Sequence, residues 1–170
     1  FRSDLIVVGA GPAGLTAGIY GARARLKTLI IEKGLPGGQI SSTQEVANYP
    51  GFLEEISGAE LGMLMAQQAE KFGAERIISE VVGMKLEGDM KEVDTLDGTF
   101  KGKTVVLAMG SKPRPIGVEG EEKFQGRGMS YCATCDGAFY SGKEVYVVGG
   151  GDAAVEEAIA LTKFVEKVTI

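Results

Sequence analysis

The chain has 170 residues, a formal net charge of −5 at pH 7 and a sequence pI near 4.9. This acidic balance disfavours a nucleic-acid partner, because the sequence has no basic stripe to meet phosphates. No apolar run reaches the ~18 residues that a transmembrane helix needs, so no membrane partner is predicted. The opening residues enter a short apolar run at once, unlike a secretory signal, and a cytoplasmic protein is expected.

An α/β architecture is predicted from short apolar runs separated by glycine-rich turns. The 26 glycines cluster at these turns. The sequence contains no histidine, which removes the commonest general base and the commonest metal ligand. Acid–base chemistry must therefore fall to a carboxylate, a thiol, a lysine or a cofactor, and no metal site is expected.

The first strand–turn–helix unit begins at residues 5–8, an apolar run that predicts a buried parallel strand. A Gly-x-Gly-x-x-Gly turn over residues 9–14 follows and opens a small-residue helix that ends near Ala24. The second strand, residues 28–31, ends at Glu32. An acid about 20 residues after such a turn completes a dinucleotide fingerprint, in which the glycines and the helix N-terminus meet a pyrophosphate and the acid accepts from a ribose hydroxyl. A plain tight turn is the alternative.

A long loop over residues 33–51 has little periodicity, which is typical of a functional loop. Ser57 and Glu60 then form a capping box that predicts the start of a helix ending near Gly73. Its methionines are interpreted as core filling. The side chains that this helix is expected to bury are Leu61, Leu64, Met65, Ala69 and Phe72.

Residues 77–100 predict a small antiparallel meander, with turn signals at residues 87–89 and 97–98. Residues 104–110 predict a return to a buried parallel strand. The segment after it contains Pro113 and Pro115, and it predicts a domain boundary that also serves as a hinge.

A second strand–turn–helix unit follows the boundary. Residues 143–148 predict a strand, Gly149-x-Gly151-x-x-Ala154 the turn, the next residues a helix to about Phe164, and residues 167–170 a further strand. Two Rossmann-like dinucleotide-binding domains with three-layer ββα architecture are therefore predicted, over residues 1–112 and 113–170. Both are expected to be incomplete, as in a fragment of a longer protein.

The only two cysteines are Cys132 and Cys135, at the spacing of a reactive pair in a reducing cytosol. If the segment is helical, the two sulfurs lie one turn apart and can bridge, and the helix dipole favours the thiolate. Asp136 follows directly and, with no histidine available, is the natural proton donor. A zinc site would need two more ligands, and a pair of inert buried thiols is the other alternative.

Together these motifs resemble those of the low-molecular-weight thioredoxin reductases of the bacterial and plant type, within class II of the pyridine nucleotide-disulfide oxidoreductases. The resemblance covers nearly the whole chain. The matching segments are the FAD turn (residues 9–14), the flavin loop (37–39 and 45–51), the active site (126–128 and 132–137) and the NADPH turn (149–158).

The resemblance implies a flavoprotein homodimer in which electrons pass from NADPH to FAD, then to the Cys132–Cys135 disulfide and then to thioredoxin. By motif position, Cys135 faces the flavin, Cys132 attacks thioredoxin and Asp136 donates a proton. Thioredoxin is expected to dock near Arg127 and Phe139. The residues implied to bind FAD are Gly9, Gly11, Pro12, Ala13, Gly14, Glu32, Gly38, Gln39, Asn48, Val82, Ala108 and Gly110. Those implied to bind NADPH are Gly150, Gly151, Asp152, Ala153 and Ala154.

Three other functions stay open. The flavoprotein subunit of an alkyl hydroperoxide reductase system shares the architecture, but it usually has Pro-His between its cysteines, where this chain has Ala133-Thr134. A ferredoxin-dependent relative tends to lose the nucleotide turn, and a non-catalytic flavin-binding module has no use for a redox pair. The family's basic segment, which selects NADPH over NADH, is expected just past Ile170, so this chain alone is predicted to be inactive.

Overall fold

The computed structural model describes residues 2–170. The chain forms two compact units, and the boundary along the sequence lies between Lys112 and Pro113. This position lies inside the proline-containing segment after the predicted strand at residues 104–110. The assignment of one cofactor to each unit stays a prediction.

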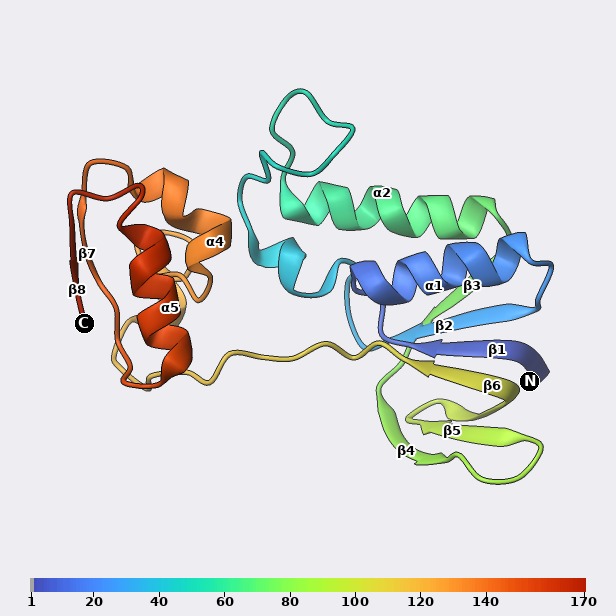
Figure 1. The fold of residues 1–170 in the computed structure, drawn as a ribbon. Helices are drawn as coiled ribbons and strands as arrows, with labels where there is room; N and C mark the ends of the chain where they lie inside the picture. The colour runs from blue at the N-terminus through green and yellow to red at the C-terminus, as the bar shows by residue number, and fades with distance from the viewer. Residues whose placement is uncertain (1) are drawn as a thin grey trace. The chain divides into compact units, whose positions relative to one another are not determined.

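The first unit is built on a six-stranded sheet with the order β3-β2-β1-β6-β5-β4 (Figure 1). The strands are β1 (Arg2–Val8), β2 (Thr28–Glu32), β3 (Glu75–Ile78), β4 (Val81–Lys85), β5 (Lys91–Thr95) and β6 (Gly98–Leu107). β1, β2, β3 and the second half of β6 pair in parallel, whereas β4, β5 and the first half of β6 form an antiparallel meander. The meander therefore starts at β4. The prediction that it starts at Ile77 is wrong, because β3 joins β2 in the parallel sheet.

Helices α1 (Pro12–Arg23) and α2 (Gly58–Lys71) lie side by side along one face of this sheet (Figure 1). They cover a core that includes Val7, Leu15 and Leu61. Side chains of the opposite face, among them Ile6 and Ile31, pack against the meander instead. The unit thus has the predicted layers, with helices on one face of the parallel strands and antiparallel strands on the other.

Helix α2 begins at the predicted cap, where the Ser57 hydroxyl accepts a hydrogen bond from the Glu60 amide at 3.2 Å. The stripe facing the core consists of Gly58, Leu61, Gly62, Met65, Ala66 and Ala69. The predicted burial of Leu64 and Phe72 is wrong, because their side chains are 41% and 37% exposed. At 100° per residue Leu64 is rotated off this stripe, and Phe72 is the residue that ends the helix. Met65 fills the core as predicted, but Met63 is exposed.

The end of β6 is less buried than predicted. Val105 and Val106 are half-buried, and Leu107 is 48% exposed. Within β6, the residues that pair with β5 are Gly98 to Gly102 only. Beyond Gly102, β6 has β1 as its neighbour on one side, and within residues 2–170 no strand pairs with its other edge.

The second unit has two short parallel strands, β7 (Glu144–Tyr146) and β8 (Lys167–Thr169). Helix α5 (Asp152–Leu161) connects them, and it packs against the short helix α4 (Ala133–Asp136). The remaining elements are α3 (Glu121–Phe124) and the 3-10 turn η2 (Gly137–Tyr140). Among the described residues, no helix is long and apolar enough to cross a membrane.

We expect Gly62→Ala to destabilise the first unit, although alanine favours a helix by about 1 kcal/mol over glycine. A Cβ at Gly62 would lie 2.7 Å from the Gly37 Cα and 2.8 Å from the Pro36 carbonyl oxygen. Forcing this backbone apart should lower the free energy of unfolding by about 1–2 kcal/mol net, measured by denaturant titration. The control is Gly34→Ala, because a Cβ there meets nothing within 4 Å. Equal stability of the two variants would contradict the prediction.

Candidate functional site

The first candidate site lies where β1, β2 and β6 end together. The Gly9 amide donates to the Ile31 carbonyl oxygen, and the Ala108 amide donates to the Val8 carbonyl oxygen, each at 2.8 Å. These bonds bring the glycine turn between the ends of the two neighbouring strands. Ligands of open α/β sheets bind at such carboxyl ends of parallel strands.

Two glycines of the turn are required by the protein itself. Gly9 has φ of +104°, and a Cβ on it would lie 2.3 Å from the Ala108 carbonyl oxygen. A Cβ on Gly14 would lie 1.8 Å from the Gly9 carbonyl oxygen. The first turn of α1 therefore packs directly on the backbone of the turn before it, which fixes the helix N-terminus at the sheet edge.

Gly11 has a different reason to be glycine. Its φ of −73° and ψ of 178° suit any residue, and the nearest atom to a Cβ would be the Gly38 Cα at an ordinary 3.8 Å. Gly11 is the N-cap of α1, no side chain caps the helix there, and the first turn holds no acidic residue. Open space in front of free amides at a helix N-terminus is the arrangement that admits a phosphate. The turn therefore fits the pyrophosphate of a dinucleotide.

Glu32 is also held at this edge. Its Oε2 accepts from the Ala10 amide and its Oε1 from the Lys33 amide, both at 2.8 Å. The carboxylate is half-buried and has lone pairs left for a further donor. The acid of the fingerprint is thus anchored to the turn, where it can accept from a ribose hydroxyl.

The loop after β2 closes over the turn. The Gly37 amide donates to the Ala10 carbonyl oxygen at 2.8 Å, and the 3-10 turn η1 (Gly38–Ser42) follows. The Gln39 amide side chain donates to the Ser111 carbonyl oxygen, just after the end of β6. Gln39 and Gly38 are therefore brought to the edge that the glycine turn occupies. This contact between residues 72 positions apart was not predicted from the sequence.

The remaining FAD residues implied by the resemblance are placed as follows. Ala108 lies against Gly9, and Gly110 follows it with φ of +66° and open space around it. Asn48 is exposed in the loop between η1 and α2, and Val82 is exposed on β4. A flavin contact at these two side chains stays a prediction.

The second glycine turn repeats the geometry of the first. Gly151 is the N-cap of α5 with φ of −94° and ψ of 176°, close to the values at Gly11, and no side chain caps this helix either. Cβ atoms at Gly150 and Gly151 would meet nothing within 4 Å. Ala154 takes the place of the third glycine and lies 3.1 Å from a Cβ built on Gly149. Asp152 and Ala153 are exposed in the first turn of α5. This turn also leaves room for a phosphate.

Cys132 and Cys135 form a disulfide, with their Cα atoms 5.3 Å apart. This confirms that the pair can bridge. Cys132 is half-buried and is the N-cap of α4, and its Sγ accepts from the Cys135 amide at 3.2 Å. An N–H group aimed at the sulfur favours the thiolate after reduction. Cys135 and Thr134 are exposed, so the bond is reachable from solvent in this unit.

Asp136 lies in a small polar cluster with Ser130 and Tyr140. The Ser130 hydroxyl donates to Asp136 Oδ2 and accepts from the Cys132 amide at 3.0 Å. Burial, and then the negative charge of Asp136, raise the pKa of the Tyr140 phenol. Sequence reasoning missed Ser130, because a serine six residues before an acid forms no recognised motif.

Tyr131, the residue before the disulfide, is tied to the start of the second unit. Its hydroxyl donates to Glu121 Oε1. The same carboxylate accepts from the Ile116 amide at 2.8 Å and the Gly117 amide at 2.7 Å. The two predicted docking residues are both on the surface: Arg127 is exposed, and the Phe139 side chain is 46% exposed. A docking role for these two residues stays a prediction.

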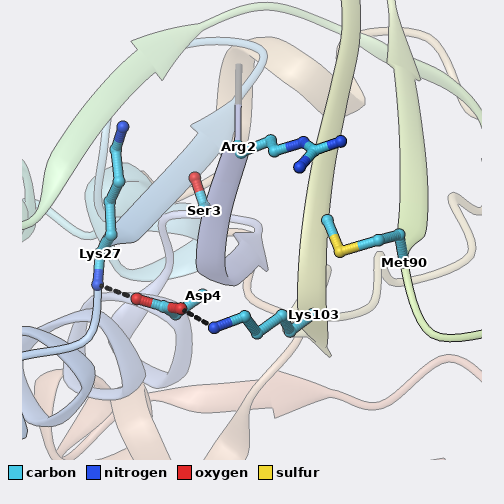
Figure 2. A pocket seen from close by; sticks show the side chains of 6 residues that line it. All are labelled: Arg2, Ser3, Asp4, Lys27, Met90 and Lys103. Carbon is cyan, nitrogen blue, oxygen red and sulfur yellow. Dashed lines mark hydrogen bonds and ion pairs between the residues drawn. The ribbon is translucent and has the colours of Figure 1, made fainter.

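A shallow hollow at the opposite end of β1 is not part of either site (Figure 2). It is lined by Arg2, Ser3, Asp4, Lys27, Met90 and Lys103, none of which is a predicted site residue. Asp4 pairs with Lys103 Nζ at 2.7 Å and accepts from the Lys27 amide at 3.0 Å, which lowers the pKa of its carboxyl. Asp4 and Lys103 therefore neutralise each other.

Comparison with known proteins agrees with this geometry. The sequence model of the family described as pyridine nucleotide-disulphide oxidoreductase matches residues 3–170. The chain belongs to this family.

Curated members of the family named thioredoxin reductase are similar over almost the whole chain. Those of Peptoclostridium acidaminophilum and Bacillus subtilis are each 51% identical over 167 residues, which is 98% of this chain and 53% and 52% of the respective relative. The crystal structure of thioredoxin reductase from Streptococcus pyogenes is 50% identical, with a TM-score of 0.93 over 98% of this chain and 54% of that one. The chain spans about half the length of the relatives it matches.

In this family member, Gly14 and Gly11 should respond differently to the same substitution. Gly14→Ala should lower the free energy of unfolding by about 3 kcal/mol or more, because its Cβ meets backbone rather than a movable side chain. Gly11→Ala should cost no more than about 1 kcal/mol, the ordinary penalty of alanine at an N-cap. Denaturant unfolding of both variants measures the difference. Equal losses would mean that Gly11 is also required by the fold.

Proposed function

We propose that this chain is part of a flavoprotein thioredoxin-disulfide reductase, which uses NADPH to reduce the disulfide of thioredoxin. The observation that carries the proposal is the Cys132–Cys135 disulfide in the same chain as two open glycine turns. Two phosphate-accepting turns fit two dinucleotides, and a disulfide beside an acid fits a two-electron relay. The curated relatives that match 98% of the chain are named thioredoxin reductase.

The residues of the first unit fit the diphosphate and ribose of FAD. The N-terminus of α1 at Gly11, with Pro12 and Ala13, would hold the pyrophosphate, and Glu32 would accept from the ribose. Gln39, Asn48, Val82, Ala108 and Gly110 would complete the flavin site. Bound FAD would supply the two-electron carrier between NADPH and the disulfide.

The second unit would hold the pyrophosphate of NADPH over Gly150 to Ala154. The chemistry of the disulfide in this unit would be carried out by the chain's own side chains. Cys132 would attack the disulfide of thioredoxin, Cys135 would resolve the mixed disulfide, and Asp136 would carry the proton. Arg127 and Phe139 would contact thioredoxin, since both are exposed.

The alternatives are less well supported. A binding module without chemistry would not need the disulfide, and the sequence between the cysteines argues against the peroxide-reducing subunit. The intact turn at Gly149–Ala154 argues against a ferredoxin-dependent relative, because such a protein has no nucleotide to bind there. We further propose that the whole protein is a cytoplasmic homodimer, as the resemblance implies.

The flavin assignment predicts that Gly11→Val in the full-length protein removes the cofactor. The valine side chain would fill the space in front of the first turn of α1, where the pyrophosphate is expected. Bound flavin per protein, measured by absorbance after gel filtration, should fall about tenfold, equivalent to about 1.4 kcal/mol of binding free energy. Gly151→Val is the matched control, because it adds the same side chain into open space at the equivalent N-cap of the second turn. Full flavin content in Gly11→Val would contradict the assignment.

The assignment of the two sulfurs predicts different behaviour of two single variants of the full-length protein. Cys135→Ser leaves Cys132 free, and it should trap a thioredoxin whose resolving cysteine has been removed as a stable mixed disulfide. Cys132→Ser should not trap it, because the remaining sulfur is the one expected to face the flavin. Intact mass measurement under non-reducing conditions detects the adduct. The reverse pattern would exchange the two roles, and the absence of any adduct would count against thioredoxin as substrate.

A further inference from the structure

We propose that Ser130 is a positioning residue that holds the Asp136 carboxylate beside the redox disulfide through a two-bond bridge from the Cys132 amide. The proposal deepens the proposed function, since it rests on the proton role given to Asp136. The bridge consists of the Cys132 N–H, the Ser130 hydroxyl and Asp136 Oδ2, in that order.

The direction of the bridge follows from the donors that are present. The Cys132 amide can only donate, so the Ser130 oxygen accepts from it at 3.0 Å. The hydroxyl has one proton, and two acceptors lie within reach, the Cys132 carbonyl oxygen at 3.3 Å and the much nearer Asp136 Oδ2. A bond to an ionised carboxylate is about twice as strong as one to a neutral acceptor. The proton therefore points at Asp136, and each bond in the chain polarises the next.

The bridge joins the two groups whose chemistry must be coordinated. Cys132 is the first residue of the disulfide loop, and Asp136 is the last residue of α4. The Asp136 amide donates to the Cys132 carbonyl oxygen at 3.1 Å. Ser130 adds a side-chain bond to this backbone bond, so the carboxylate moves with the loop. Asp136 is half-buried, and after burial its negative charge is the second cause that raises the pKa of the Tyr140 phenol. In the absence of Ser130 the carboxylate is free to rotate towards water.

Positioning matters most in the step in which the disulfide re-forms. The Cys132 thiolate attacks a disulfide substrate, and one thiolate leaves. Cys135 then attacks Cys132 Sγ, its thiol proton passes to the Asp136 carboxylate and on to solvent, and the second thiolate leaves as the Cys132–Cys135 bond forms. Two electrons have moved from the cysteine pair to the substrate, and the two cysteine protons are available to the two released thiolates. Reduction of the pair reverses the proton's path.

The test measures this step without NADPH, flavin turnover or thioredoxin. Full-length protein is reduced with dithiothreitol, freed of reductant and mixed with dithiobis(nitrobenzoate), whose second coloured thiolate is released as the pair closes. We expect Ser130→Ala to slow the second phase about tenfold, a part of the 10²–10⁴-fold that a positioned acid or base contributes. Ser130→Thr keeps a hydroxyl at this half-buried position and should restore the rate.

A double-mutant cycle separates positioning from a general loss of structure. In an Asp136→Asn background no proton acceptor is left to position, so Ser130→Ala should then have little further effect. Independent, multiplied effects of the two substitutions, or failure of Ser130→Thr to restore the rate, would overturn the proposal. If the full-length protein fails to reduce thioredoxin but this cycle behaves as expected, the proposed function is wrong and the role of Ser130 stands.

Discussion

The structure of the first unit depends on one backbone contact, the approach of α1 to the turn that precedes it. The space between Gly14 and the Gly9 carbonyl oxygen is too small for any side chain, since a Cβ would lie at 1.8 Å. This contact sets the helix start against the ends of β1 and β6. The loop that follows β2 then bonds to the same turn through Ala10 and Gly37. The closeness of these backbones places the glycine turn, Ala108 and the start of the loop at Gly37 at one edge of the sheet.

The glycines of one motif thus have separate physical reasons. Gly9 supplies a left-handed backbone and Gly14 a close approach, and both requirements are internal to the protein. Gly11 satisfies neither requirement, since its backbone is ordinary and its surroundings are open. A glycine that the fold does not need is best explained by a ligand that needs the open space in front of it. The second unit repeats this backbone pattern at Gly151, although the first turn of α5 carries the acidic Asp152 and that of α1 has no acid.

The redox segment follows a different principle, because its geometry is almost entirely local. A single helical turn brings Cys132 and Cys135 together, and the residues that bond to the pair come from the adjacent chain. Ser130 and Glu121 connect the segment to its flanks, the first to Asp136 and the second to the residues that follow the domain boundary. The bonds that shape the disulfide loop therefore come from nearby residues, while α4 as a whole packs against α5.

The sequence by itself determined the two strand–turn–helix units, the Ser57 cap and the pairing of the cysteines, because each depends on spacings of a few residues along the chain. Only the tertiary structure decided that β3 joins the parallel sheet, that Leu64 lies outside the buried stripe of α2, and that Gln39 reaches Ser111. The contact between Ser130 and Asp136 is local, but it was found only in the structure because no recognised residue pattern marks it. The difference has a physical cause. Helix and turn geometry is fixed by the local backbone, whereas strand partners and side-chain bridges are chosen by which distant surfaces the packed chain brings into contact.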